Sequence, residues 1–226
     1  MACAAPSDTV PHRWQFCLQC ADFELATIRA RLNTTQAALN SIRIVVTVTL
    51  DKQPQPTLFF DYQISIADKA LAKQLAWTPW QTQRVGFTDY LWQETCLECF
   101  IAPSTDSRYL EINAHPDGRY ALYQFEHYRH PSTLPPPALI DPIQQTKAQI
   151  DWQPDTALDG TLTKAGYSYQ RRFSLPLAVL FGADHAAHPA RLHPCVILRF
   201  ADSYLYFAPK HPMPPDFHDR QYWTAL

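Results

Sequence analysis

The residues best suited to chemistry lie between Trp92 and Asn113, where an aromatic ring, two carboxylates and an amide occur close together. Glu98 and Glu111 supply the carboxylates, and a second ring in polar surroundings, Trp223, lies near the end of the chain. An aromatic face can stack on the apolar C–H face of a pyranose, while carboxylates and amides hydrogen-bond its hydroxyls. This combination of residue types favours a sugar-binding site.

The two glutamates also permit a different interpretation. Paired carboxylates about 5–10 Å apart are the machinery of glycoside hydrolysis. The simpler roles are to hydrogen-bond a ligand or to pair with an arginine such as Arg199, and we expect one of these. The chain has no G-x-S-x-G elbow, Walker loop, H-E-x-x-H or dinucleotide fingerprint. It therefore contains no complete catalytic motif, and a glycoside-acting enzyme using Glu98 and Glu111 remains the alternative to binding alone.

Two cysteine pairs have the C-x-x-C spacing of a zinc half-site, Cys17 with Cys20 and Cys96 with Cys99. Zinc half-sites usually lie on tight turns with Gly or Pro close by, and neither FCLQCAD nor TCLECFI contains one. Buried reduced thiols are the favoured interpretation, with zinc left open. The two other cysteines are Cys3 and Cys195.

Several histidines could serve as metal ligands or general bases. Those near the richest loops are His115, His127, His130, His211 and His218. Surface or capping roles are commoner for such residues, so no metal and no cofactor is expected.

The positioning elements follow from hydrophobic alternation with a period of two, which indicates strands with one buried face. Residues 42–50 and 58–66 alternate in this way across a turn, which predicts a hairpin. Residues 94–101 predict a further strand, and 109–129 predict two strands joined at HPDG. On these strands the alternation places Glu98, Glu111 and Asn113 on the same non-core face. Further strands are expected at 148–152, 167–175, 196–201, 204–208 and the C-terminus, with short helices near 67–77 and 176–182.

Composition limits the function classes. The chain has 226 residues, 46% of them hydrophobic, with a formal net charge of −2. Clustered Lys and Arg, which a nucleic-acid or anionic membrane surface requires, are missing. Only five glycines argue against a phosphate-cradling nucleotide site. The sequence shows neither a membrane-spanning apolar run nor a signal-peptide pattern at its start, so one cytoplasmic all-β domain over 1–226 is expected.

The segments LWQETCLECFIAPSTDSRYLEINAHPDGRYALYQFEHYR and KHPMPPDFHDRQYW add a family resemblance. Together they resemble the DOMON-like proteins related to family 9 carbohydrate-binding modules. The first covers roughly residues 90–130 and the second the C-terminal part. The resemblance implies a two-sheet antiparallel β-sandwich, jelly-roll-like, with one or two short helices.

The resemblance also implies a site and a ligand. Trp92 and Trp223 match two rings that clamp a terminal sugar, and Glu98 and Asn113 match its polar partners. Where the modules tend to have a basic residue and an amide, this chain has Glu111 and Arg220. The expected ligand-binding residues are Trp92, Glu98, Glu111, Asn113, Arg220 and Trp223. The expected partner is a small sugar or oligosaccharide.

Two further alternatives come from the same superfamily. Some members bind haem through Met and His, and this chain has only Met1 and Met213 for such a role. A haem or metal sensor would therefore rest on Met213. The scaffold could also have lost its site and serve as an interaction module.

Overall fold

The alternating apolar residues predicted to pair form the hairpin of β2 (Ile42–Asp51) and β3 (Thr57–Ile66). Its register aligns Ile42 with Ile66 and Asp51 with Thr57, so the apolar residues of both strands share one buried face. The predicted strand β10 (Gly166–Pro176) extends this layer beside β3.

The computed structural model describes residues 11–103, 107–181 and 189–226. Met1, Cys3 and Gly182, which entered the sequence expectations, lie outside these ranges.

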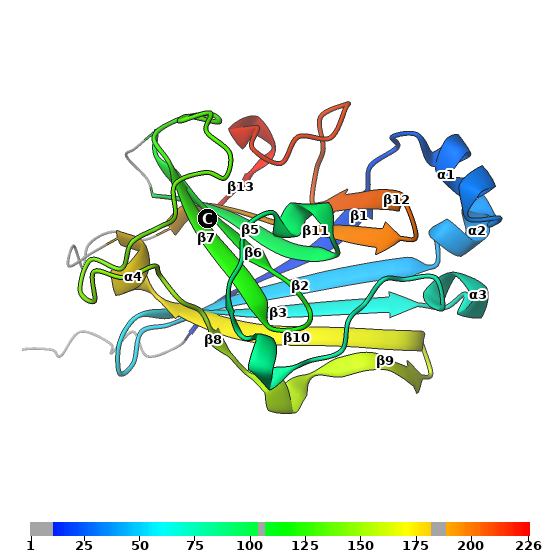
Figure 1. The fold of residues 1–226 in the computed structure, drawn as a ribbon, viewed down its shortest axis with the longest axis horizontal. Coiled ribbons are helices and arrows are strands. Elements are labelled where there is room, and N and C mark those ends of the chain that lie inside the picture. The colour runs from blue at the N-terminus through cyan, green and yellow to red at the C-terminus, as the bar shows by residue number, and fades with distance from the viewer. Residues whose placement is uncertain (1–10, 104–106, 182–188) are drawn as a thin grey trace, which may run out of the picture.

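The strands form two layers that curl around a shared core (Figure 1). One layer holds β2, β3 and β10, with β8 (Asp151–Trp152) and β9 (Leu158–Thr163) on the far side of β10. The other layer runs in the order β4 (Gly86–Phe87), β7 (Arg119–Phe125), β6 (Tyr109–Ala114), β5 (Cys96–Pro103), β11 (Pro189–Phe200) and β12 (Ser203–Ala208). The short strand β13 (Thr224–Ala225) pairs with β11, and β4 pairs with β7 in parallel.

The expected separation into two sheets is only partly met, because the first strand joins the layers. β1 (His12–Cys20) pairs with β2 along most of its length and with β12 through Gln19 and Cys20. These pairings on two sides make the strands one continuous, curled, hydrogen-bonded series. This strand was not predicted from the sequence.

Helices are more numerous than the one or two expected. The described residues contain four short α-helices: α1 (Leu25–Arg31), α2 (Gln36–Leu39), α3 (Lys69–Ala72) and α4 (Leu177–Phe181). Single 3-10 turns are η1 (Thr82–Arg84), η2 (Leu91–Gln93), η3 (Pro154–Thr156) and η4 (Arg220–Tyr222). No helix within the described ranges is both long and apolar enough to span a membrane.

The predicted alternation along β5 is confirmed and produces two apolar clusters. Leu97, Cys99 and Ile101 face the large core between the layers, whereas Cys96 and Phe100 belong to a second cluster on the outer face. The C-terminal segment covers that outer face with Phe217 and Trp223. The face that carries Glu98 is therefore buried, which its predicted non-core position did not indicate.

Candidate functional site

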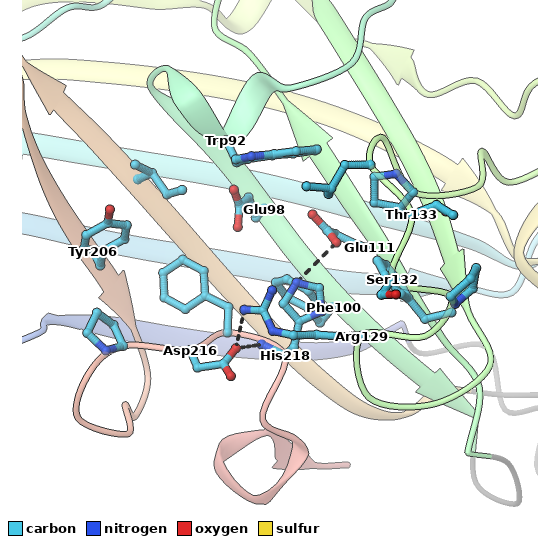
Figure 2. A pocket seen from close by; sticks show the side chains of 17 residues that line it. Trp92, Glu98, Phe100, Glu111, Arg129, Ser132, Thr133, Tyr206, Asp216 and His218 are labelled. Atoms are coloured by element: carbon cyan, nitrogen blue, oxygen red, sulfur yellow. Dashed lines mark hydrogen bonds and ion pairs between the residues drawn. The ribbon is translucent and has the colours of Figure 1, made fainter.

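A cavity of about 440 Å³ opens on the outer face of β5 and β6 (Figure 2). Small-molecule sites typically measure about 300–1,000 Å³. The strands supply its floor, while the loop after β7 and the C-terminal segment supply its sides. The lining residues are Trp92, Glu98, Phe100, Glu111, Phe125, Arg129, Pro131, Ser132, Thr133, Leu134, Pro136, Ile197, Tyr206, Pro215, Asp216, Phe217 and His218.

Trp92 forms one wall of the cavity. It lies in η2, which begins after Tyr90 in the left-handed region (φ 66°). Its ring packs edge-on against Tyr90 and Tyr123, with centroid distances of 5.3 and 5.9 Å. Figure 2 shows the indole lying over the Glu98 carboxyl group. The ring is thus held in place while it remains on the cavity lining.

Glu98 and Glu111 bring two carboxyl groups onto the cavity floor, as the alternation along the strands predicted. Glu98 pairs with Asn113 across β5 and β6, and Glu111 pairs with Phe100 in the same ladder. Glu98 is 2% exposed, and its Oε1 has no hydrogen-bond partner within the described residues. Burial, followed by the charge of Glu111, raises the pKa of Glu98 well above its usual range.

The carboxyl group of Glu111, unlike Oε1 of Glu98, has hydrogen-bonding and ion-pair contacts within the described residues. Its Oε1 accepts a hydrogen bond of 2.6 Å from Nδ2 of Asn113, and its Oε2 lies 3.7 Å from Nε2 of His218. Burial raises the pKa of Glu111 to about 7, although the Asn113 bond and Arg129 act in the opposite direction. This cavity therefore favours the neutral form of both acids.

A chain of hydrogen bonds orients His218 toward Glu111. The backbone N–H of Arg129 donates to the hydroxyl oxygen of Tyr109 at 3.0 Å, and the same hydroxyl forms a hydrogen bond of 2.7 Å with Nδ1 of His218. With the tyrosine O–H as the donor, the imidazole proton lies on Nε2, which faces Glu111. Burial, followed by the charge of Arg129, lowers the pKa of His218 to about 3. At neutral pH the contact with Glu111 is therefore not an ion pair.

Arg129 is the cationic side chain of the lining, and it already has a partner. Its Nη2 donates to Asp216 at 2.8 Å, and Tyr128 and the backbone N–H of His218 donate to the same carboxylate. Arg129 adopts a left-handed backbone (φ 49°), a conformation that costs free energy for a residue with a Cβ. The strained turn and the ion pair link the loop after β7 to the C-terminal segment over the cavity.

Three of the expected ligand-binding residues, Asn113, Arg220 and Trp223, do not line the cavity. Trp223 is only 4% exposed, and its ring stacks on His193 at 6.2 Å while its Nε1–H donates to the Phe217 carbonyl at 2.9 Å. Arg220 lies over the Trp223 ring and donates to the Ser107 carbonyl at 2.8 Å. Trp92 and Trp223 therefore do not form a clamp, because the Trp223 ring is buried in the outer-face apolar cluster.

Asn113 also lies beneath the cavity, without lining it. It is fully buried, donates to Glu111 and accepts a weak bond from the Cys96 thiol at 3.4 Å. Asn113 therefore positions Glu111, and its side chain does not reach the cavity in which a ligand was expected to contact it.

The C-x-x-C pairs do not form a zinc site in this fold. Residues three apart on a strand point to opposite faces, and Cys96 and Cys99 accordingly belong to different apolar clusters. Cys17 and Cys20 lie on β1 in the same relation. All four are free thiols, as is Cys195.

The histidines and methionine considered as metal ligands lie mostly apart from the cavity. Among the described residues, one group has donor atoms within 4.8 Å of one another, formed by the exposed side chains of Glu126, His127 and His130. Met213 is 59% exposed and is not part of the cavity lining, so a Met–His haem site finds no support there.

Sequence reasoning missed several lining residues. Phe100 has the same parity as Glu98 and could have been found from that signal. Arg129 and Asp216 contact each other although they are 87 positions apart in the sequence, and no local pattern predicts such a contact. His218 was noted as a histidine without a role in the site.

Replacing Glu111 with glutamine should change how stability depends on pH. Between the ordinary glutamate pKa of 4.5 and the folded value of about 7, the folded state retains a proton that the unfolded state has lost. The wild type therefore loses stability as pH rises through this window, whereas glutamine does not titrate. Relative to wild type, the free energy of unfolding of Glu111→Gln should gain about 2 kcal/mol between pH 5 and pH 7.5. Urea unfolding of both proteins at both pH values measures this. The same stability difference between variant and wild type at pH 5 and pH 7.5 would contradict a raised pKa for Glu111.

Comparison with known proteins supports the fold. No family model matches the chain, and no curated protein matches it. A crystal structure from Bacteroides uniformis ATCC 8492, described as a "putative carbohydrate-binding protein", is similar to it with a TM-score of 0.53. The identity is 12%, and the match covers 94% of this chain and 85% of that chain. At this identity the similarity shows a shared β-rich fold.

Proposed function

We propose that this protein binds a carbohydrate or sugar derivative in the cavity beneath Trp92, by stacking and hydrogen bonding and without catalysis. The observation that carries the proposal is the buried Glu98 carboxyl group, whose Oε1 has no partner among the described residues. Buried polar atoms are nearly always hydrogen-bonded, so an unpaired oxygen in a cavity indicates a missing donor. A sugar hydroxyl is such a donor.

The remaining lining fits the same ligand class. The Trp92 ring provides an apolar face, and Ser132 and Thr133 add hydroxyls on the loop that borders the cavity. The structural neighbour described as a "putative carbohydrate-binding protein" shares the fold and is consistent with this proposal. The proposal includes a relationship to the DOMON-like proteins and family 9 carbohydrate-binding modules. Their fold is a two-sheet sandwich, whereas in this chain β1 joins the two layers.

The enzyme alternative has less support from the carboxyl pair. Glycosidases keep one carboxylate ionised to act as nucleophile or base. Here burial raises the pKa of Glu98 well above its usual range and that of Glu111 to about 7, so the site disfavours the ionised form of both acids. This electrostatic pattern favours hydrogen bonding to a ligand over hydrolysis.

Removing the Trp92 ring tests the proposal. We expect Trp92→Ala to weaken sugar binding about tenfold, since stacking contributes about 1 kcal/mol or slightly more. Intrinsic fluorescence during titration with mono- and disaccharides is the measurement. Trp80→Ala is the matched control, because Trp80 is also half-buried but packs on Trp152 outside the cavity. Equal affinities in both variants would argue against this site.

A further inference from the structure

Among the described residues, no lysine or arginine forms an ion pair with either acid of the carboxyl pair on the cavity floor. Glu98 and Glu111 are 2% and 5% exposed. Within the described part of the chain, the basic side chain nearest to Glu111 in an ion-pair contact is His218, whose Nε2 lies 3.7 Å from Oε2 of Glu111. That imidazole is neutral at neutral pH because burial lowers its pKa to about 3. Buried carboxylates are normally paired with a cation or neutralised by a proton. A ligand that brings its own positive charge would therefore match what this floor lacks.

The charges around the cavity lead to the same conclusion. The lining contains three carboxyl groups (Glu98, Glu111 and Asp216) and one guanidinium group (Arg129). Arg129 is already engaged with Asp216 at 2.8 Å. An anionic ligand would have to displace Asp216 from Arg129, whereas a cation meets two acids that form no ion pair with a lysine or arginine among the described residues.

The walls suit a cation as well. Aromatic faces attract positively charged groups within about 6 Å of the ring centroid. Trp92 lies over Glu98, and Phe100 and Tyr206 also face the cavity (Figure 2). A small ammonium group on the floor would thus meet carboxyl oxygens below and an indole face above.

We infer that the ligand carries a primary ammonium group that binds between Glu98 and Glu111 beneath Trp92, which makes an unacetylated amino sugar the preferred ligand class. This inference rests on the proposed function and narrows it. The competing arrangement is a neutral sugar whose neighbouring hydroxyls bridge the two acids. The two differ in whether a charge on the ligand matters.

Calorimetric titration with three sugars of one ring configuration separates these arrangements. The probes are D-glucose, D-glucosamine and N-acetyl-D-glucosamine at pH 6.5, where the free amine is protonated. We expect glucosamine to bind at least tenfold more tightly than glucose, and acetylation to remove that advantage because it removes the charge. Cyclohexylamine tests whether an ammonium group without the sugar hydroxyls is sufficient, and it should bind more weakly than glucosamine.

Two glutamate variants connect the preference to the cavity floor. Glu98→Gln removes the negative charge while keeping the shape of the side chain, so the affinity ratio of glucosamine to glucose should fall from at least tenfold to about one, whatever happens to the glucose affinity itself. Glu126→Gln makes the same change on the loop after β7, where the side chain is 72% exposed, and it should keep the preference.

Each other outcome overturns a defined part of the account. Equal affinity for the three sugars, or tighter binding of the acetylated sugar, overturns the ammonium inference and leaves sugar binding standing. Cyclohexylamine binding as tightly as glucosamine supports the ammonium site and contradicts the sugar function. Failure of folded protein to bind any probe overturns both.

Discussion

Replacing Glu98 with leucine should weaken sugar binding about 10- to 100-fold while making the protein more stable. Leucine removes both carboxyl oxygens, and hydrogen bonds to such groups contribute about 1.5–3 kcal/mol. In the free protein, Oε1 of Glu98 is buried with no partner among the described residues, which costs about 1–3 kcal/mol. Urea unfolding and calorimetric sugar titration on the same samples measure the two effects.

Opposite signs for stability and binding are the signature of a residue kept for its ligand. Glu126→Leu, on the exposed loop, should leave both quantities nearly unchanged. Loss of stability in Glu98→Leu with unaltered binding would mean that Glu98 is a structural residue.

Replacing Arg171 with methionine should cost about 3–5 kcal/mol of unfolding free energy. Arg171 is 1% exposed, and its guanidinium donates to the Pro116 carbonyl at 2.6 Å and also to Asp159. It lies over the Trp77 ring at 5.1 Å, and Trp77 donates to the same aspartate at 2.8 Å. The substitution leaves the Pro116 carbonyl without its guanidinium donor and Asp159 without its cationic partner.

This guanidinium links β10 to the β6–β7 turn, so it joins the two layers of the fold. The adjacent Arg172 is the natural control, since its side chain is 37% exposed and pairs with Asp61 at 2.9 Å. Arg172→Met should cost about 1 kcal/mol or less, as surface ion pairs do. Equal losses in thermal or urea unfolding would show that Arg171 has no special role.

Local patterns predicted the strands that carry the site. Alternation along β5 and β6 placed Glu98 and Glu111 on one face, and the register of these strands confirms it. The same reasoning predicted the β2–β3 hairpin. Parity arguments succeed here because successive side chains on a strand point to opposite faces.

What covers that face could not be predicted in the same way. Trp223 has the polar neighbours of a ligand-facing ring, yet the fold buries it on His193. The sequence pattern of β1 did not show that it would bridge β2 and β12. Both outcomes depend on contacts between segments far apart in the chain, which local periodicity does not encode.

The indole N–H signals of the tryptophans, followed by ¹H–¹⁵N NMR during titration with glucosamine and glucose, test the central claim most directly. The cavity beneath Trp92 predicts a saturable shift of the Trp92 signal, with the signals of Trp80 and Trp152 unchanged. These two rings contact each other at 5.3 Å and lie outside the cavity lining. Shifts at Trp80 or Trp152 with none at Trp92, or no shift at any tryptophan, would contradict sugar binding at this site.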